Sequence, residues 1–236
     1  MMLVSVPALA GQVRVAVASN FAETIRAIAE RYEEQTGHSV LISSGSTGKH
    51  YAQIRHGAPF DVFLAADARR PALLEKEGIA QPDSRYTYAI GKLVLWSPKA
   101  DMVDKHGWVL EQSGFRYLAI ANPKLAPYGR AAQQLLESRG LWADMQGRLV
   151  RGENIGQTYQ YVASGNAELG LVAYAQIRQP DVAVTGSFWL VPQDLYDPIE
   201  QQVVLLKDKD IARDFLDFIR SDEGRTIISS YGYGVP

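Results

Sequence analysis

Cysteine is absent from the 236 residues of this protein, and only four histidines are present. Disulfide frameworks, thiol nucleophiles and cysteine-rich zinc sites are therefore excluded. Neither sign of charge dominates, because the chain has 24 lysines and arginines and 26 aspartates and glutamates, for a net charge of −2. The chain therefore offers no basic field to a nucleic-acid backbone. No apolar run approaches the ~18 residues of a membrane-spanning helix, so no direct membrane insertion is expected.

Hydrophobic residues make up 47% of the chain and charged residues 21%, an ordinary composition for a globular protein. A chain of this length forms one large domain or two of about 100–120 residues, and either can bury a core without crosslinks. Two classes of function remain. The protein is either an enzyme that uses oxygen or carboxylate chemistry, or a binding protein.

The first ten residues are apolar and end in Ala8-Leu9-Ala10, a small-x-small pattern of the kind that signal peptidases cleave. Alternating polar and apolar residues follow from Gly11. We interpret residues 1–10 as the remnant of an export signal without its charged start; the alternative is an ordinary N-terminal strand. Export together with the absence of cysteine predicts a periplasmic protein that folds without disulfides.

Strands alternate with helices in the first third of the chain. Residues 13–18 alternate with period two and predict a strand. The apolar residues that follow predict a helix that begins at Asn20, where Glu23 completes a capping-box pattern, and ends at Gly37 in the left-handed conformation. Two further strands are predicted, at 38–43 and 61–66. This β-α-β-α-β order predicts a parallel, doubly wound sheet.

The second half shows the same alternation and predicts a second α/β lobe. Strands are predicted at 88–96, 117–121, 170–174 and 199–206. The long strands 88–96 and 199–206 are expected to cross between the lobes. We assign 11–90 with 198–236 to lobe 1 and 91–197 to lobe 2. Gly91, in the first crossing, is either a hinge residue or a glycine required by close packing.

Four loops leave a predicted strand and open a predicted helix. They contain hydroxyl side chains, an amide, glycines and backbone N–H groups, with almost no charge. Unpaired N–H groups and the helix dipole make such helix starts natural anion sites. Any single loop is better explained as an ordinary capped helix start, but together the four would surround an anion with neutral donors. The loops are 18–21, 45–48, 127–129 and 154–156.

Motifs for catalysis are weak by comparison. Gly45-Ser46-Thr47-Gly48-Lys49 has two residues between its glycines instead of the four of a phosphate-binding P-loop, and His50 follows the lysine in place of Ser or Thr. There is no Gly-x-Ser-x-Gly nucleophile motif, and no two histidines are spaced for metal binding on one helix. The sequence favours a binding protein over an enzyme.

Six segments of the chain resemble the molybdate-binding periplasmic proteins of ABC transporters. They lie in the same order as in that family and span the chain after residue 11. The resemblance implies a class II periplasmic binding protein, in which two doubly wound α/β lobes are joined by two crossing strands and the ligand binds in the cleft between them. The segments are Ala18-Ser19-Asn20-Phe21, 42–48, Gly57-Ala58-Pro59-Phe60-Asp61-Val62-Phe63, Asn122-Pro123 with 126–129, Glu153-Asn154-Ile155-Gly156 and Gly170-Leu171-Val172-Ala173.

The same resemblance implies which residues bind the oxyanion. Asn20 and Thr47 match the positions of the first lobe, with Ser19 and Ser46 beside them. Tyr128 and Ile155 match positions of the second lobe that offer backbone N–H groups. Some members use a tyrosine hydroxyl from the Gly-Leu-Val strand; here Ala173 occupies that position and Tyr174 follows it, so Tyr174 is left out of the expected site.

The expected function is therefore the capture of molybdate, and also tungstate, in the periplasm and its delivery to an ABC-type membrane permease. No cofactor is expected, and the molybdenum is contacted only through its oxygen atoms. The protein is expected to be a monomer whose lobes close on the ligand. Two alternatives remain open: the same fold binding sulfate or another small anion, and an α/β enzyme with an unrecognised site.

Overall fold

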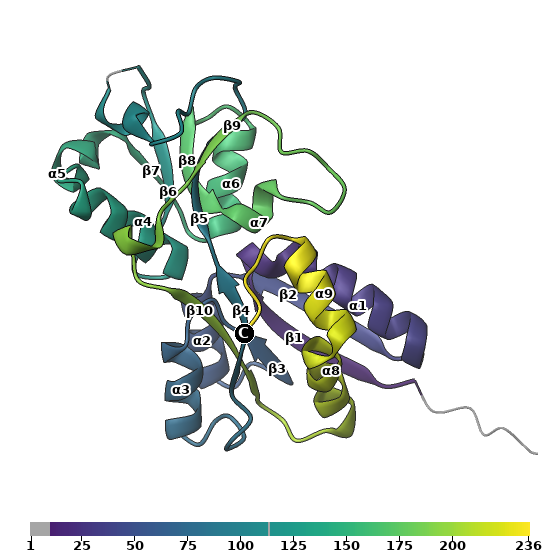
Figure 1. Cartoon of the computed structure of the whole chain (residues 1–236). Coiled ribbons are helices and arrows are strands. Elements are labelled where there is room, and N and C mark those ends of the chain that lie inside the picture. The colour runs from purple at the N-terminus through teal and green to yellow at the C-terminus, as the bar shows by residue number, and fades with distance from the viewer. Residues whose placement is uncertain (1–9, 113) are drawn as a thin grey trace, which may run out of the picture.

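The computed structural model describes residues 10–112 and 114–236, so the interpreted export signal falls almost wholly outside the described residues. The chain folds into two lobes, each built on a five-stranded sheet with helices on both faces (Figure 1). Within the described residues, no helix has the length and apolar character needed to cross a membrane.

Lobe 1 contains the first third of the chain and its C-terminal end. Its sheet has the strand order β2-β1-β3-β10-β4. The strands are β1 (Gln12–Ala18), β2 (Ser39–Gly45), β3 (Val62–Leu64), β4 (Tyr86–Gly91) and β10 (Ile199–Leu205). The helices are α1 (Ala22–Thr36), α2 (Thr47–Arg55), α3 (Arg69–Lys76), α8 (Asp210–Arg220) and α9 (Asp222–Ser230), with a 3-10 turn η1 (Ser19–Phe21) before α1.

Lobe 2 is formed by the middle of the chain, with the strand order β7-β6-β8-β5-β9. The strands are β5 (Leu93–Ser97), β6 (Leu118–Ala121), β7 (Leu149–Gly152), β8 (Leu169–Ala173) and β9 (Ser187–Leu190). The helices are α4 (Pro127–Ser138), α5 (Trp142–Met145), α6 (Ile155–Ala163) and α7 (Tyr174–Ile177). Three 3-10 turns complete this lobe: η2 (Trp108–Glu111), η3 (Gln146–Arg148) and η4 (Gln193–Leu195).

Each sheet is buried on both faces, as a doubly wound fold requires. In β1, Val15 packs with residues of α1 and α8, whereas the next residue, Ala16, joins a cluster on the other face with Phe63 and Leu74. Lobe 2 repeats this arrangement, with α4 on one face of its sheet and α6 on the other. The predicted fold class, two α/β lobes of the periplasmic binding protein type, is confirmed.

The sheets are mixed, and this corrects the purely parallel sheet expected for the first lobe. Strands β1, β2 and β3 are parallel, but β10 runs antiparallel to both β3 and β4. The reason is that β10 enters lobe 1 from lobe 2, so its direction is set by the crossing. The strand expected at 88–96 is also interrupted at Lys92, and its two halves, β4 and β5, belong to different sheets.

The expected start of the first helix was also wrong. Helix α1 begins at Ala22, its N-cap Phe21 makes no side-chain capping bond, and Asn20 lies in the preceding 3-10 turn. The Asn20 side chain instead forms hydrogen bonds with Gln201 and Tyr233, which lie far along the chain. The expected end is confirmed, because Gly37 follows the helix with φ +71°.

Candidate functional site

A small cavity lies between the lobes, where strands β1, β2, β6 and β7 end and the next helices begin. The carboxyl ends of parallel strands are the usual ligand-binding edge of such sheets. The cavity and the solvent space at its mouth together have ≈ 180 Å³ free of atoms, and every described side chain that lines the cavity is uncharged. All six residues expected from the sequence line it, with five more: Ser19, Asn20, Ser46, Thr47, Tyr128 and Ile155, then Ala18, Gly45, Ala66, Ala126 and Pro127.

Helix α2 presents one free backbone donor to this cavity. The Gly48 N–H donates to the Leu125 carbonyl of lobe 2 at 2.9 Å, and the Lys49 N–H donates to the Ser46 hydroxyl at 3.2 Å. The Thr47 N–H is left without a partner among the described residues. A free first-turn N–H at the positive end of the helix dipole is a natural donor to an anion.

Helix α4 presents a second donor from lobe 2. Pro127, its first residue, has no N–H, and the Gly129 N–H donates to the Ala126 carbonyl at 3.0 Å. The Tyr128 N–H lacks a partner in the part of the chain that the structure describes. The position of this turn is tightly constrained, because a Cβ on Gly129 would overlap the Ala121 carbonyl oxygen.

Helix α6 presents the third donor. The Gly156 N–H donates to the Ser19 hydroxyl at 3.1 Å and the Gln157 N–H to Asn154 Oδ1, the cap of the helix, at 2.9 Å. Within residues 10–112 and 114–236, only Ile155 of this turn keeps an unused N–H beside the cavity. Three helix starts from two lobes thus direct one free N–H each at the same small space.

Two buried hydroxyls add donors, because each oxygen accepts a hydrogen bond while its proton has no acceptor among the described residues. Ser46 caps α2 by accepting from the Lys49 N–H at 3.2 Å, and Thr47 Oγ1 accepts from the Ala66 N–H at 3.1 Å. A hydroxyl has one proton to donate in addition to its accepting lone pairs. The protons of Ser46 and Thr47 therefore remain free for a ligand with acceptor oxygens.

Ser19, expected beside Asn20 in the site, forms hydrogen bonds between the two lobes. Its hydroxyl donates to Asn154 Oδ1 at 3.1 Å and accepts from the Gly156 N–H at 3.1 Å. Its single proton is thereby used. Because Ser19 belongs to lobe 1 and both partners to lobe 2, this side chain bridges the lobes at the edge of the cavity.

Asn20 is also engaged by the protein. Its side chain, 4% exposed, donates from Nδ2 to Gln201 Oε1 at 2.6 Å and to the Tyr233 hydroxyl at 3.1 Å. Its Oδ1 is buried without a partner among the described residues. Asn20 therefore lines the cavity but, in this orientation, directs its amide N–H groups away from it.

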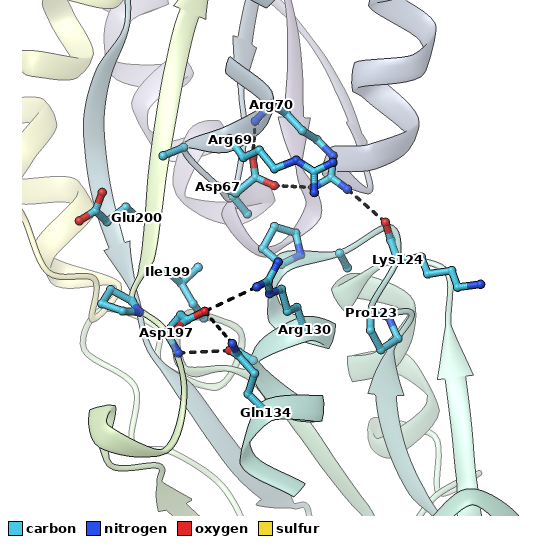
Figure 2. A pocket seen from close by; sticks show the side chains of 16 residues that line it. Asp67, Arg69, Arg70, Pro123, Lys124, Arg130, Gln134, Asp197, Ile199 and Glu200 are labelled. Carbon is cyan, nitrogen blue, oxygen red and sulfur yellow. Dashed lines mark hydrogen bonds and ion pairs between the residues drawn. The ribbon is translucent and has the colours of Figure 1, made fainter. Parts of the chain in front are cut away.

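A larger, charged pocket adjoins the cavity on one side and shares Ala66, Ala126 and Pro127 with it. Figure 2 shows Arg70 of lobe 1 reaching the backbone carbonyl of Lys124 in lobe 2, at 3.1 Å. The pocket has ≈ 1010 Å³ of space between atoms. This contact and the Gly48–Leu125 bond hold the lobes together on this side of the cavity, as Ser19 does on the other.

The Tyr128 side chain is directed at the crossing strands. Its hydroxyl is fully buried, has no hydrogen-bonding partner among the described residues and lies against Gly91, which pairs with Ile199 of β10. Burial raises the pKa of the Tyr128 hydroxyl well above its usual value, so the group stays protonated. Of the two interpretations of Gly91, the structure supports close packing. Tyr174, left out of the expected site, packs against Gly232 outside the cavity lining.

The sequence did not predict the residues that hydrogen-bond to the Asn20 and Thr47 side chains. Gln201 and Tyr233 hold the Asn20 amide, and Ala66 occupies the acceptor side of Thr47. None of them belongs to a recognisable motif. The adjacent glutamines Gln201 and Gln202, in a strand that otherwise ends in four apolar residues, were an available signal. In the described residues, no group of three or more His, Asp or Glu side chains is arranged to hold a metal ion.

Comparison with known proteins adds independent findings. The family model described as bacterial extracellular solute-binding protein matches residues 13–234. The molybdate-binding protein ModA of Azotobacter vinelandii is 48% identical over 236 residues, which cover 99% of this chain and 94% of that protein. The ModA protein of Rhodobacter capsulatus is 46% identical over 232 residues, 97% of this chain and 90% of that one. The solved structure of the Azotobacter vinelandii periplasmic molybdate-binding protein superposes with a TM-score of 0.93, at 44% identity, over 95% of this chain and 99% of that chain.

Proposed function

The chain belongs to the family of bacterial extracellular solute-binding proteins, and from this premise we propose that it captures molybdate, and also tungstate, for delivery to an ABC-type membrane permease. The observation that carries the proposal is the convergence of three free backbone N–H groups and two free hydroxyls on one uncharged cavity. Its relatives with 46–48% identity are named for molybdate binding. The function is binding and transport, not catalysis.

Neutral donors can hold a dianion when several of them converge. Burying an unpaired ion costs tens of kcal/mol, whereas one hydrogen bond to a charged group contributes about 1.5–3 kcal/mol net. The five free donors of this cavity, together with the positive ends of α2, α4 and α6, act in a site where little water screens them. Because none of the described residues that line the cavity is a cation, release to the permease does not require breaking an ion pair.

The absence of carboxylates from the lining favours a fully deprotonated ligand. The proton of an anion such as hydrogen phosphate is accepted most strongly by a carboxylate, and the described side chains that line the cavity are hydroxyl, amide, aromatic and aliphatic groups. Sulfate shares the charge and tetrahedral shape of molybdate, so discrimination between them is proposed to depend on cavity size. Both halves of the cavity come from one chain, which supports action as a monomer, and the location proposed is the periplasm.

Calorimetric titration of the purified protein with molybdate, tungstate, sulfate and phosphate tests the proposal directly. Molybdate and tungstate should bind with similar affinity, and sulfate and phosphate at least about a hundredfold more weakly, a difference of about 2.8 kcal/mol. Equal binding of sulfate would favour the alternative ligand. An absence of heat with all four anions would reject the proposed function.

The Ser19 bridge makes a second prediction, about lobe closure. Ser19→Ala removes two hydrogen bonds between the lobes and should weaken molybdate binding by about threefold to tenfold, because closure becomes less favourable. Lys49→Met is the matched control. Lys49 also contacts lobe 2, through Glu153, but both side chains are about half exposed, so this pair contributes little. Both variants are titrated with molybdate at one ionic strength. If Ser19→Ala bound molybdate as tightly as Lys49→Met, the Ser19 hydrogen bonds would not contribute to lobe closure.

A further inference from the structure

Two buried side-chain amides meet behind the cavity. Gln201, fully buried, lies at the β-bulge where the pairing of β10 with β4 shifts between Gln201 and Gln202. Bulges redirect side chains, and here the Gln201 amide reaches across lobe 1 to Asn20, with Oε1 2.6 Å from Asn20 Nδ2. Gln201 itself does not line the cavity.

In this orientation the Asn20 and Gln201 amides leave one acceptor and one donor without a hydrogen-bonding partner among the described residues. Among the described residues, Asn20 Oδ1 and Gln201 Nε2 are both buried without a partner. Asn20 lines the cavity, whereas Gln201 and Tyr233, at which its Nδ2 is directed, do not. With Nδ2 so engaged, Oδ1 is the amide atom of Asn20 left for the cavity. That atom is an acceptor and would repel the oxygens of an anion.

Inverting both amides together reverses this polarity and keeps their mutual hydrogen bond. Gln201 Nε2 would then donate to Asn20 Oδ1, and Asn20 Nδ2 would face the cavity as a sixth donor. The Tyr88 hydroxyl now donates to Gln201 Oε1 at 3.3 Å and to the Ala65 carbonyl at 3.1 Å. After the inversion it would accept from Gln201 Nε2 and donate to the Ala65 carbonyl alone. The cost of the inversion is the bond from Asn20 Nδ2 to Tyr233, whose hydroxyl proton is already donated to the Asn20 carbonyl at 2.8 Å.

We propose that Gln201 is a positioning residue for the ligand: it inverts together with Asn20 and holds the Asn20 amide with its N–H groups toward the bound oxyanion. The inference rests on the proposed function. A ligand shifts such a two-state element only through a difference in its interactions with the two states. The anion supplies this difference, because it meets an acceptor oxygen in one orientation and a donor N–H in the other. Ligand binding would thereby be sensed on β10, one of the strands that joins the lobes.

The test uses the full chain and titration with molybdate. Burial raises the pKa of a glutamic acid placed at position 201, so Gln201→Glu is titrated at a pH at which the group is ionised. The carboxylate can then only accept and holds Asn20 in the orientation with Oδ1 toward the cavity, and affinity should fall by about tenfold to a hundredfold. Gln202→Glu is the matched control. It adds the same charge one residue along the same strand, but its side chain contacts Arg85 and Thr87, and its affinity should stay within about threefold of wild type.

A double-mutant cycle distinguishes positioning from a general structural role. Gln201→Met removes the amide at similar size and should weaken molybdate binding by about threefold to tenfold. If Gln201 acts through Asn20, this loss should vanish in an Asn20→Ala background. The same loss in both backgrounds, or unchanged affinity of Gln201→Met, would overturn the inference while the function stands. Failure of the wild-type chain to bind molybdate would instead overturn the proposed function.

Discussion

Replacing Thr47 by valine is expected to weaken molybdate binding by about tenfold to a hundredfold and to lower the free energy of unfolding by about 1–3 kcal/mol. Valine keeps the shape of the side chain but removes both functions of the hydroxyl. The ligand loses a donor proton, and the buried Ala66 N–H loses the oxygen that accepts its hydrogen bond at 3.1 Å. Calorimetric titration measures the first effect and denaturant unfolding without ligand the second.

Thr47→Ser is the control for this substitution. Serine retains the hydroxyl and loses only a methyl group, so its affinity should remain much closer to wild type than that of the valine variant. Comparing molybdate with sulfate in both variants also tests selection by size, since Thr47→Val hardly changes the dimensions of the cavity. If Thr47→Val abolished the preference for molybdate with little loss of affinity, the number of hydrogen bonds would set selectivity, and the size argument would be wrong.

Replacing Gly91 by alanine should disturb both the lobe connection and the ligand site. The new Cβ would overlap the Tyr128 hydroxyl and lie 2.9 Å from the ring carbon that bears it. Overpacking of this kind costs about 1–3 kcal/mol of unfolding free energy. Because the Tyr128 N–H is one of the free donors, displacing Tyr128 should also weaken molybdate binding by about tenfold or more.

The Tyr128→Phe variant tests whether Gly91→Ala acts through overlap with the Tyr128 hydroxyl or through another contact. Among the described residues its hydroxyl has no hydrogen-bonding partner, so removing it should leave the free energy of unfolding unchanged or raise it by about 1 kcal/mol. Affinity should be retained, because the backbone N–H stays in place. Combined with Gly91→Ala, the phenylalanine should restore part of the lost stability and binding, measured by unfolding and titration. Simple addition of the two single effects would show that Gly91 acts through some other contact.

The order of elements and the loops of the site were predictable from local sequence patterns. Period-two alternation marked β1, and helical spacing with Gly37 marked α1 and its end. These signals are local because backbone geometry fixes side-chain periodicity. The six expected site residues also lie in loops that directly follow strands, and parallel strands bring such loops to one edge. The sequence therefore located the cavity lining, although the role of these residues as ligands stays a proposal.

What only the tertiary structure decided is which donors remain free. The Ser19 hydroxyl donates its proton to Asn154, 135 residues away in the sequence. The Asn20 amide donates to Gln201 and Tyr233, which are 181 and 213 residues away. The Thr47 hydroxyl accepts from the Ala66 N–H, and its proton has no acceptor among the described residues. A side chain's type gives its hydrogen-bonding capacity, but the part of that capacity left for a ligand depends on every neighbour that folding brings into contact. The sequence therefore identified six of the eleven lining residues, whereas packing determined which of their hydrogen-bonding groups are already used within the protein.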